Sequence, residues 1–215
     1  MSVPAAPRFA AWLALLAVLG IESAIAQQPA RAPPVEEPRG APAPGLESLP
    51  DRAVWKRITL GRYRSVSAIR EALEAARVRV GDMADEILGR PAFPYSRMPI
   101  AVDLLVLTPG DLGFTRETPL EDIERRAAQL GLDLCPAEVG PLVRLSYVDQ
   151  PVGEFLRIAM KPVATWRGTP VTLTIANGGT GPILLGGESR PDFTFAPATR
   201  FVFVRPQRIA SPDAR

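Results

Sequence analysis

Apolar and polar residues alternate with a period of two through much of the second half of this 215-residue chain. Such stretches, or short apolar runs bounded by turn residues, occupy 143–147, 156–160, 171–175, 183–185 and 200–205. Successive side chains of a strand point to opposite faces of a sheet, so the alternation predicts strands with one buried and one solvated face. Such strands are typical of antiparallel sheets, and Asn177-Gly178-Gly179 provides a turn between two of them.

The residues before this region show helical spacing instead. Apolar residues three or four positions apart predict helices over residues 65–76 and 82–88. A third helix is expected over residues 118–131, with Thr118 as its cap and Pro119 in its first turn, where a missing N–H costs nothing. Each helix should cover a hydrophobic core with its apolar stripe.

Two further strands are expected among these helices. Residues 54–60 predict an early strand, and the nearly continuous apolar run 100–108 is typical of a central strand covered on both faces. Helices near the front followed by a series of hairpins indicate an α+β fold. We therefore expect a largely antiparallel sheet with two or three helices packed on one face, in one domain over residues 51–206.

The first 26 residues have the organisation of a secretory signal peptide. Arg8 precedes the apolar segment 9–21, and Ala24-Ile25-Ala26 offers the small residues that a cleavage site requires. An apolar segment of about 13 residues is too short to span a bilayer, since a spanning helix takes about 20. The mature protein is expected to begin at Gln27, to be exported to the periplasm or the extracellular medium, and to have no stable membrane span after signal cleavage.

Proline and alanine dominate residues 27–50, and few side chains there could contribute to a core. Segments of this composition favour extended polyproline II geometry or remain disordered. We expect a disordered linker over residues 27–50, followed by the 51–206 domain and a short disordered tail over residues 207–215.

The composition excludes several classes of function. The chain has no histidine and one cysteine, so it cannot form a Ser-His-Asp triad, a Cys-His pair or a zinc site built from those ligands. No cofactor and no metal are predicted, with an all-oxygen calcium site as the one exception that scattered acids could supply. The 25 basic residues nearly balance the 23 acidic ones and form no run interleaved with aromatic residues, which argues against nucleic-acid binding.

An unusual group of residues lies in the stretch 130–151, LGLDLCPAEVGPLVRLSYVDQP. Within it, Cys135-Pro136-Ala137-Glu138 has the order of a helix start, namely a cap, a proline and an early glutamate. Gly140-Pro141 follows as a stop, so a one-turn helix is expected before the next strand. In this interpretation Glu138 accepts a hydrogen bond from the Cys135 N–H and is structural.

A functional interpretation of the same stretch stays open. Glu138, Asp149 and Glu154 could form a carboxylate cluster for general acid–base work on a glycan. Arg144 and Tyr147 are then the candidates for binding and positioning the substrate. Sequence spacing places no two of these acids at a catalytic separation, so the prediction favours a structural junction with no catalytic residue.

Residues 130–162 also resemble a phrase shared by an uncharacterised bacterial protein family, roughly GL-L-CPAEVGP-LRL-Y-DQP-GE-L-IAM-P. The phrase stands here as GLDLCPAEVGPLVRLSYVDQPVGEFLRIAMKP, with Val143 as an insertion. The resemblance extends over about residues 55–203 but is specific only in this part. It implies one compact domain, and it implies no activity and no site residues.

Two functions from different classes remain as predictions. The first is a non-catalytic binding or accessory protein of the cell envelope, which recognises an envelope component or a partner protein through its sheet or loops. The second is a histidine-free glycan hydrolase or lyase that uses a carboxylate pair. A cleft lined by two of the three acids would favour the enzyme, and a flat or convex surface there would favour the binding protein.

Overall fold

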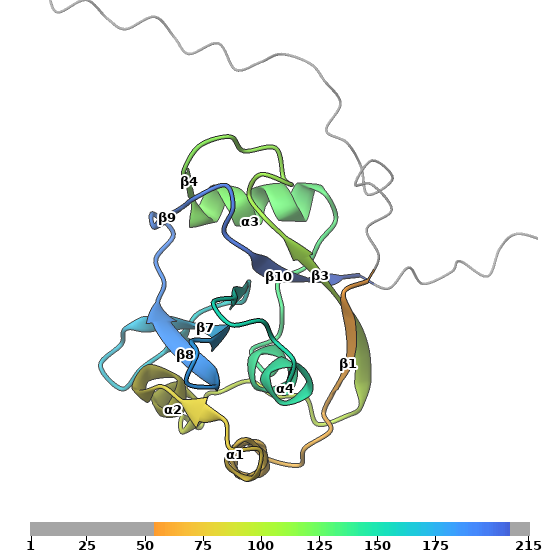
Figure 1. Ribbon diagram of the computed structural model, residues 1–215, viewed down its shortest axis with the longest axis vertical. Coiled ribbons are helices and arrows are strands. Elements are labelled where there is room, and N and C mark those ends of the chain that lie inside the picture. The colour runs from red at the N-terminus through yellow and green to blue at the C-terminus, as the bar shows by residue number, and fades with distance from the viewer. Residues whose placement is uncertain (1–53, 207–215) are drawn as a thin grey trace, which may run out of the picture. The chain divides into compact units, whose positions relative to one another are not determined.

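The computed structural model describes residues 54–206, all within the unit Pro42–Arg215. The predicted signal peptide (1–26), linker (27–50) and tail (207–215) lie outside the described residues. Within residues 54–206, four helices and ten strands form an α+β fold (Figure 1).

A mixed, mostly antiparallel sheet is the frame of the domain. Its strands lie in the order β1-β3-β10-β5-β7-β8-β2, with β6 paired to β7, while β4 and β9 form a separate ribbon. The β10–β5 and β2–β8 pairs are parallel, and the others are antiparallel. The strands are β1 (Lys56–Leu60), β2 (Arg79–Val80), β3 (Ile100–Leu107), β4 (Thr118–Pro119), β5 (Phe155–Ile158), β6 (Val163–Ala164), β7 (Pro170–Asn177), β8 (Pro182–Glu188), β9 (Thr194–Phe195) and β10 (Phe201–Arg205).

The helices are short. They are α1 (Val66–Ala75), α2 (Asp82–Leu88), α3 (Leu120–Gln129) and α4 (Val139–Ser146). None of the helices in residues 54–206 is long and apolar enough to cross a membrane.

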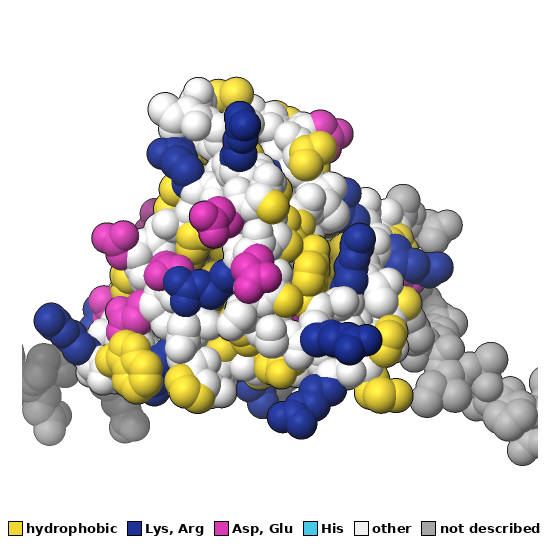
Figure 2. Space-filling model, turned by 90° about the horizontal axis from the view of Figure 1, so that it is seen from below, with side chains coloured by type: hydrophobic (Ala, Val, Ile, Leu, Met, Phe, Trp, Pro, Cys, Tyr) yellow, Lys and Arg dark blue, Asp and Glu magenta, His cyan; other side chains and the backbone are white. Residues whose placement is uncertain are grey.

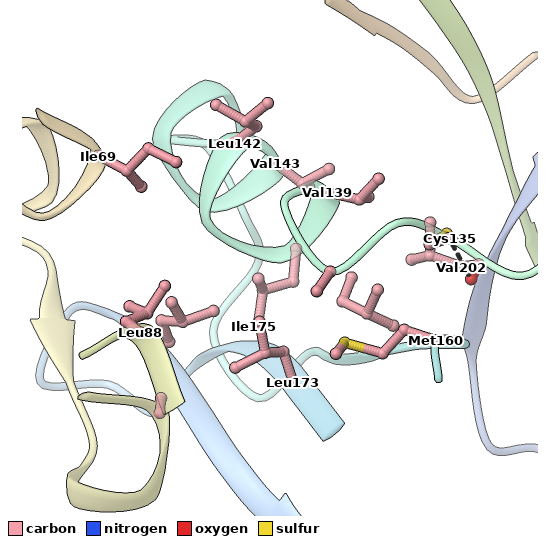
Figure 3. Close-up of a cluster of buried hydrophobic side chains, with 14 of the residues drawn as sticks. Ile69, Leu88, Cys135, Val139, Leu142, Val143, Met160, Leu173, Ile175 and Val202 are labelled. Carbon is pink, nitrogen blue, oxygen red and sulfur yellow. Dashed lines mark hydrogen bonds between the residues drawn. The ribbon is translucent and has the colours of Figure 1, made fainter. Parts of the chain in front are cut away.

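The sheet curves around α4, which lies in the larger of two hydrophobic cores (Figure 1). Helix α4 contacts β1 near one end of the strand order, β7 and β8 near the other, and α1. Figure 3 shows Val139, Leu142 and Val143 of α4 in one cluster with Ile69 of α1, to the left of the helix, and with the β7 residues Leu173 and Ile175, below it. Because every residue from Val139 to Arg144 is buried, α4 is an internal element of the domain.

A second, smaller core lies on the other face of β3 and β10. Leu104 of β3 belongs to the core around α4, whereas its neighbour Leu105 packs with Ile123 of α3. Strand β10 alternates in the same way, with Val202 in the first core and Phe203 in the second. The central position predicted for the 100–108 strand is therefore confirmed. The packing of the helices on one face of the sheet is not confirmed, because α3 contributes to the second core.

The strand predicted over residues 143–147 is wrong, because these residues continue α4 to Ser146 and end at its cap, Tyr147. Pro141 does not stop the helix, since it lies in the first turn, where backbone N–H groups have no intrahelical partner. Gly140 does not stop it either. A Cβ atom at Gly140 would lie 2.7 Å from the Leu173 Cδ1 atom, so glycine allows the close approach of α4 to β7.

Two helix starts differ in how they are capped. Ser65, the first residue of the helix predicted over residues 65–76, caps α1, and its Oγ accepts a hydrogen bond from the Ala68 N–H at 3.1 Å. Thr118 does not cap α3, because it lies in β4. The Leu120 N–H donates instead to the backbone carbonyl of Phe193, and that of Glu121 to the carbonyl of Pro191. Carbonyl groups of a distant loop thus accept the hydrogen bonds that a capping side chain would accept. The local sequence around α3 does not reveal this loop.

Candidate functional site

The N-terminal end of α4 is fixed by the carboxylate of Glu138. This side chain is 0% exposed. Its Oε1 accepts a hydrogen bond from the Gly61 N–H at 2.9 Å, and its Oε2 accepts one from the Ser96 N–H at 2.8 Å. The negative charge also lies at the positive end of the helix macrodipole. Glu138 is therefore a brace between α4 and two loops that are far away in the sequence.

The predicted hydrogen bond from Cys135 to Glu138 is wrong. The Cys135 N–H donates to the Ala159 carbonyl at 2.6 Å, in a bridge that pairs residue 135 with Met160. The thiol donates to the Val202 carbonyl at 3.2 Å (Figure 3). Burial raises the pKa of the Cys135 thiol, so the reactive thiolate is disfavoured. Residue 135 therefore joins the segment before α4 to the residues after β5 and to β10, through hydrogen bonds other than the predicted one.

The C-terminal end of α4 is fixed by Arg144, which is 1% exposed. Its guanidinium donates to the side chain of Gln150, to the Tyr147 carbonyl, and to the Ala176 carbonyl of β7 at 3.2 Å. Its Nε is buried without a hydrogen-bond partner among the described residues. Burial lowers the pKa of Arg144. A buried guanidinium committed to backbone carbonyls cannot reach out to a ligand, so Arg144 lacks the accessibility that a binding residue needs.

Tyr147 and Glu154 lie near each other beyond this end of α4. Burial and the neighbouring Glu154 carboxylate raise the pKa of the Tyr147 hydroxyl, with a smaller contribution from Asp149. Glu154 forms an ion pair with Arg200, and its Oε2 is buried without a partner among the described residues. Asp149 is exposed. Two of the three predicted acids thus belong to one neighbourhood, together with the predicted binding residue Tyr147.

The third acid, Glu138, is not part of that neighbourhood. It precedes the first residue of α4, whereas Tyr147 follows the last. A helix of eight residues separates its ends by about 12 Å, at about 1.5 Å per residue. The three carboxylates therefore do not converge on one point, and Glu138 is already occupied by two backbone donors.

A hollow of the described surface lies elsewhere, between β1, α1 and α4. It is a groove of about 910 Å³. Its lining comes from β1 and the loop after it, from small side chains of α1, and from α4: Arg57, Ile58, Thr59, Gly61, Arg62, Tyr63, Ala72, Ala75, Ala76, Pro99, Leu142, Leu145 and Ser146. We call it the β1 groove.

The β1 groove runs along an open strand edge. Within residues 54–206, β1 pairs with β3 alone, so its other edge has no strand partner in this part of the chain. Ile58 and Leu60 point into the core, and Arg57 and Thr59 are exposed. The three alanines of α1 keep the opposite wall low. The result is a trough with backbone polar groups on one side and apolar side chains at its base.

The charge on this groove is positive. No acidic residue is among those that line it. Arg57 forms a two-point ion pair with Asp103 of β3, but Arg62 forms no ion pair or hydrogen bond with another described residue and only approaches the Tyr63 ring, at 6.0 Å. Figure 2, seen from the side of α1 and α2, shows Lys and Arg side chains gathered on the β1 side and most acidic side chains away from it.

Sequence analysis missed the β1 groove, because no local pattern marks a strand as an edge or places an edge beside a helix. The nearest signal was Ala72, Ala75 and Ala76, three small residues at helical spacing on an otherwise polar face of α1. Among residues 54–206 there is also no group of three or more His, Cys, Asp or Glu side chains arranged to hold a metal ion.

The fold and the groove together define a mixed α+β domain whose curved sheet encloses a helix and leaves the outer edge of β1 without a strand partner among residues 54–206. No protein-family model matches the chain, and neither a curated protein sequence nor a solved structure shows significant similarity to it. The similarity of residues 130–162 to a bacterial family stays a prediction from the sequence. Function must therefore be inferred from the groove itself.

Proposed function

We propose that this protein is a non-catalytic binding protein whose domain takes an extended, acidic segment of a partner protein into the β1 groove. The observation that carries the proposal is the groove of about 910 Å³ along the open edge of β1. An extended peptide can add to such an edge through main-chain hydrogen bonds, while neighbouring pockets select its side chains. Ile58, Leu142 and Leu145 supply apolar surface for alternate side chains of the peptide.

The acidic character of the partner is inferred from charge. Arg62 brings an uncompensated positive charge to the groove, and no lining residue opposes it. Complementary charge across an interface raises the association rate and disfavours wrong partners. A segment that alternates apolar and acidic residues would place one set on the groove floor and the other near Arg62 and the solvent.

The cellular setting of the proposal comes from the sequence. With a signal peptide over residues 1–26, the protein acts in the periplasm or outside the cell, and its partner is an envelope component or another exported protein. The proline-rich segment 27–50 would then be an extended N-terminal leader of the mature domain. Sequencing the N-terminus of the exported protein tests this part, with Gln27 as the expected first residue.

A glycan hydrolase or lyase is the weaker proposal. Glu138 is bonded to two backbone donors, which leaves Asp149 and Glu154 as the carboxylate pair. Neither of these acids lines the β1 groove. If the enzyme proposal is right, replacing Asp149 by Asn should abolish turnover of an envelope glycan without changing peptide binding.

Peptide binding to the full chain tests the main proposal. Synthetic peptides that alternate valine with glutamate are compared with peptides that alternate valine with lysine, by fluorescence anisotropy at constant ionic strength. We expect the acidic peptide to bind and Arg62→Glu to weaken binding at least about tenfold, since a like charge replaces the complementary one. Arg64→Glu is the matched control, because Arg64 is exposed in the same loop and does not line the groove.

A second pair of variants tests the site without changing its charge. Ala75→Trp should fill the groove and weaken peptide binding, whereas Ala75→Ser should leave binding within about twofold, because it keeps the space open. Equal binding of acidic and lysine-containing peptides, or equal effects of Arg62→Glu and Arg64→Glu, would contradict the proposal. Self-association that Ala75→Trp abolishes would replace the partner protein with a second copy of the chain.

A further inference from the structure

A second cavity lies on another part of the domain, between the start of α1 and the end of α2. It measures about 280 Å³. Its polar lining consists of Ser67, Arg70, Arg90 and Tyr95, and no acidic residue lines it. Since none of these residues lines the β1 groove, the cavity does not depend on the function proposed above.

Arg90 is the unusual residue of this cavity. Its side chain forms no hydrogen bond and no ion pair with the described residues, and its Nε is buried without a partner among them. The guanidinium instead packs on Trp166 of the β6–β7 hairpin, whose ring centre lies 4.1 Å from the guanidinium carbon. The ring packs against the guanidinium, but it offers no oxygen that could accept hydrogen bonds from the guanidinium N–H groups. A half-buried guanidinium without an acceptor is costly, and an anion in the cavity would remove that cost.

The other groups around the cavity carry charges of both signs, and the acids among them are already engaged. Arg70 adds a second guanidinium, which forms an ion pair with Asp85. Glu86 is the other nearby acid, and its carboxylate accepts a hydrogen bond from the Trp166 backbone N–H at 2.7 Å. The C-terminal end of α2 carries a partial negative charge of at most about half a unit, which repels an anion. The full positive charge of Arg90 outweighs this partial charge.

We propose that this cavity binds the oxyanion group, carboxylate or phosphate, of a small ligand. Arg90 would donate two parallel hydrogen bonds to two oxygens of the group, the geometry for which a planar guanidinium is suited. The Ser67 and Tyr95 hydroxyls supply further donors. A volume of about 280 Å³ suits a small anionic molecule better than a polymer, because pockets for drug-sized ligands begin near 300 Å³.

Titration of the full chain with inorganic phosphate and, separately, with acetate tests the proposal. Binding is followed by calorimetry and by tryptophan fluorescence, since an anion on Arg90 changes the surroundings of the Trp166 ring. Ionic strength is held constant, so that general screening cannot imitate binding. We expect saturation by at least one of the two anions, and the arm that saturates identifies the phosphate or the carboxylate as the preferred group.

Variants separate the cavity from general surface charge. Arg90→Gln should weaken anion binding at least about tenfold, and Arg90→Lys should weaken it less, because lysine keeps the charge and loses the two-point geometry. Arg167→Gln is the matched control, since Arg167 is exposed beside Trp166 and does not line the cavity; it should change binding by less than about twofold.

The proposal is overturned if neither anion saturates below about 50 mM, a concentration at which even weak specific sites fill. Equal binding by the wild-type protein and Arg90→Gln would overturn it too. If Arg90→Gln fails to fold, the ratio between Arg90→Lys and Arg167→Gln decides the question, because a site on Arg90 requires the lysine variant to bind more weakly than the control.

Discussion

The two ends of α4 carry opposite buried charges that are satisfied to different degrees. At the N-terminal end, both carboxylate oxygens of Glu138 accept hydrogen bonds from backbone N–H groups. At the C-terminal end, Arg144 donates to three acceptors but keeps a buried Nε without a partner among the described residues. Nearby, one oxygen of Glu154 is also buried without a partner in this part of the chain.

Both charges match the helix macrodipole, negative at the N-terminus and positive at the C-terminus. The difference lies in what each holds. Glu138 bonds two loops through both of its carboxylate oxygens, while Arg144 belongs to a network in which Gln150 also bonds backbone carbonyls, those of Glu154 and Ile175. Removing a fully used buried charge should therefore cost more than removing one from a shared and incomplete network.

Glu138→Ala is expected to have the largest effect on stability. It leaves the Gly61 and Ser96 N–H groups without the acceptors that the buried Glu138 carboxylate provides. Each donor left without its acceptor typically costs about 1–3 kcal/mol. Urea unfolding at neutral pH measures the loss.

The matched control for this variant is Glu74→Ala on the exposed face of α1. It should change the free energy of unfolding by no more than about 0.5 kcal/mol. A Glu138→Ala protein as stable as this control, but unable to bind peptide or glycan, would make Glu138 a functional residue and contradict the assignment of the brace.

Arg144→Met should have a smaller effect, about 1–2 kcal/mol. The variant leaves the Ala176 and Tyr147 carbonyls without a donor. However, it also removes a buried charge and its unpaired Nε, and methionine keeps much of the side-chain volume. Comparing its unfolding free energy with that of Glu138→Ala tests the asymmetry between the two ends, which an equal or larger loss for Arg144→Met would refute.

Glu154→Gln should change stability by less than about 1 kcal/mol, because its ion pair is with Arg200, a partly exposed partner. The amide keeps the shape of the side chain and can still accept one hydrogen bond. A loss comparable to that of Glu138→Ala would show that the C-terminal network is as tightly coupled as the N-terminal brace. Calorimetric melting of the two variants side by side is sufficient.

The surface ion pair Arg57–Asp103 is expected to have the smallest effect on stability among these variants, and its contribution depends on pH. Hydrogen bonds from Arg57 lower the pKa of the Asp103 carboxyl. A group with a lowered folded-state pKa stabilises the fold above its unfolded pKa, about 3.9 for Asp, and loses that contribution as the pH falls through the folded-state value. Asp103→Asn should therefore lower the urea midpoint slightly at pH 7 and not at about pH 2. An equal shift at both pH values would show that its effect is not electrostatic.

Several elements of this fold follow from local sequence, because their side-chain pattern and their backbone preferences agree. The spacing of Ile69 and Leu73 predicted α1, and the alternation over residues 171–175 predicted β7. The continuous apolar run of β3 also indicated its burial on both faces, which the two cores confirm. Such features need only near neighbours, so the chain encodes them locally.

Tertiary structure alone decided the rest. Residues 143–147 alternate like a strand, yet they belong to α4, in which every residue from Val139 to Arg144 is buried. A helix that is buried around most of its circumference shows no clear 3.6-residue alternation of apolar and polar residues. The roles of Glu138 and Arg144 depend on distant segments, because Glu138 bonds Gly61, 77 residues away, and Arg144 bonds Ala176, 32 residues away. The open edge of β1 and the unpaired guanidinium of Arg90 likewise depend on which distant segments pack beside them. A local sequence pattern carries no information about those segments.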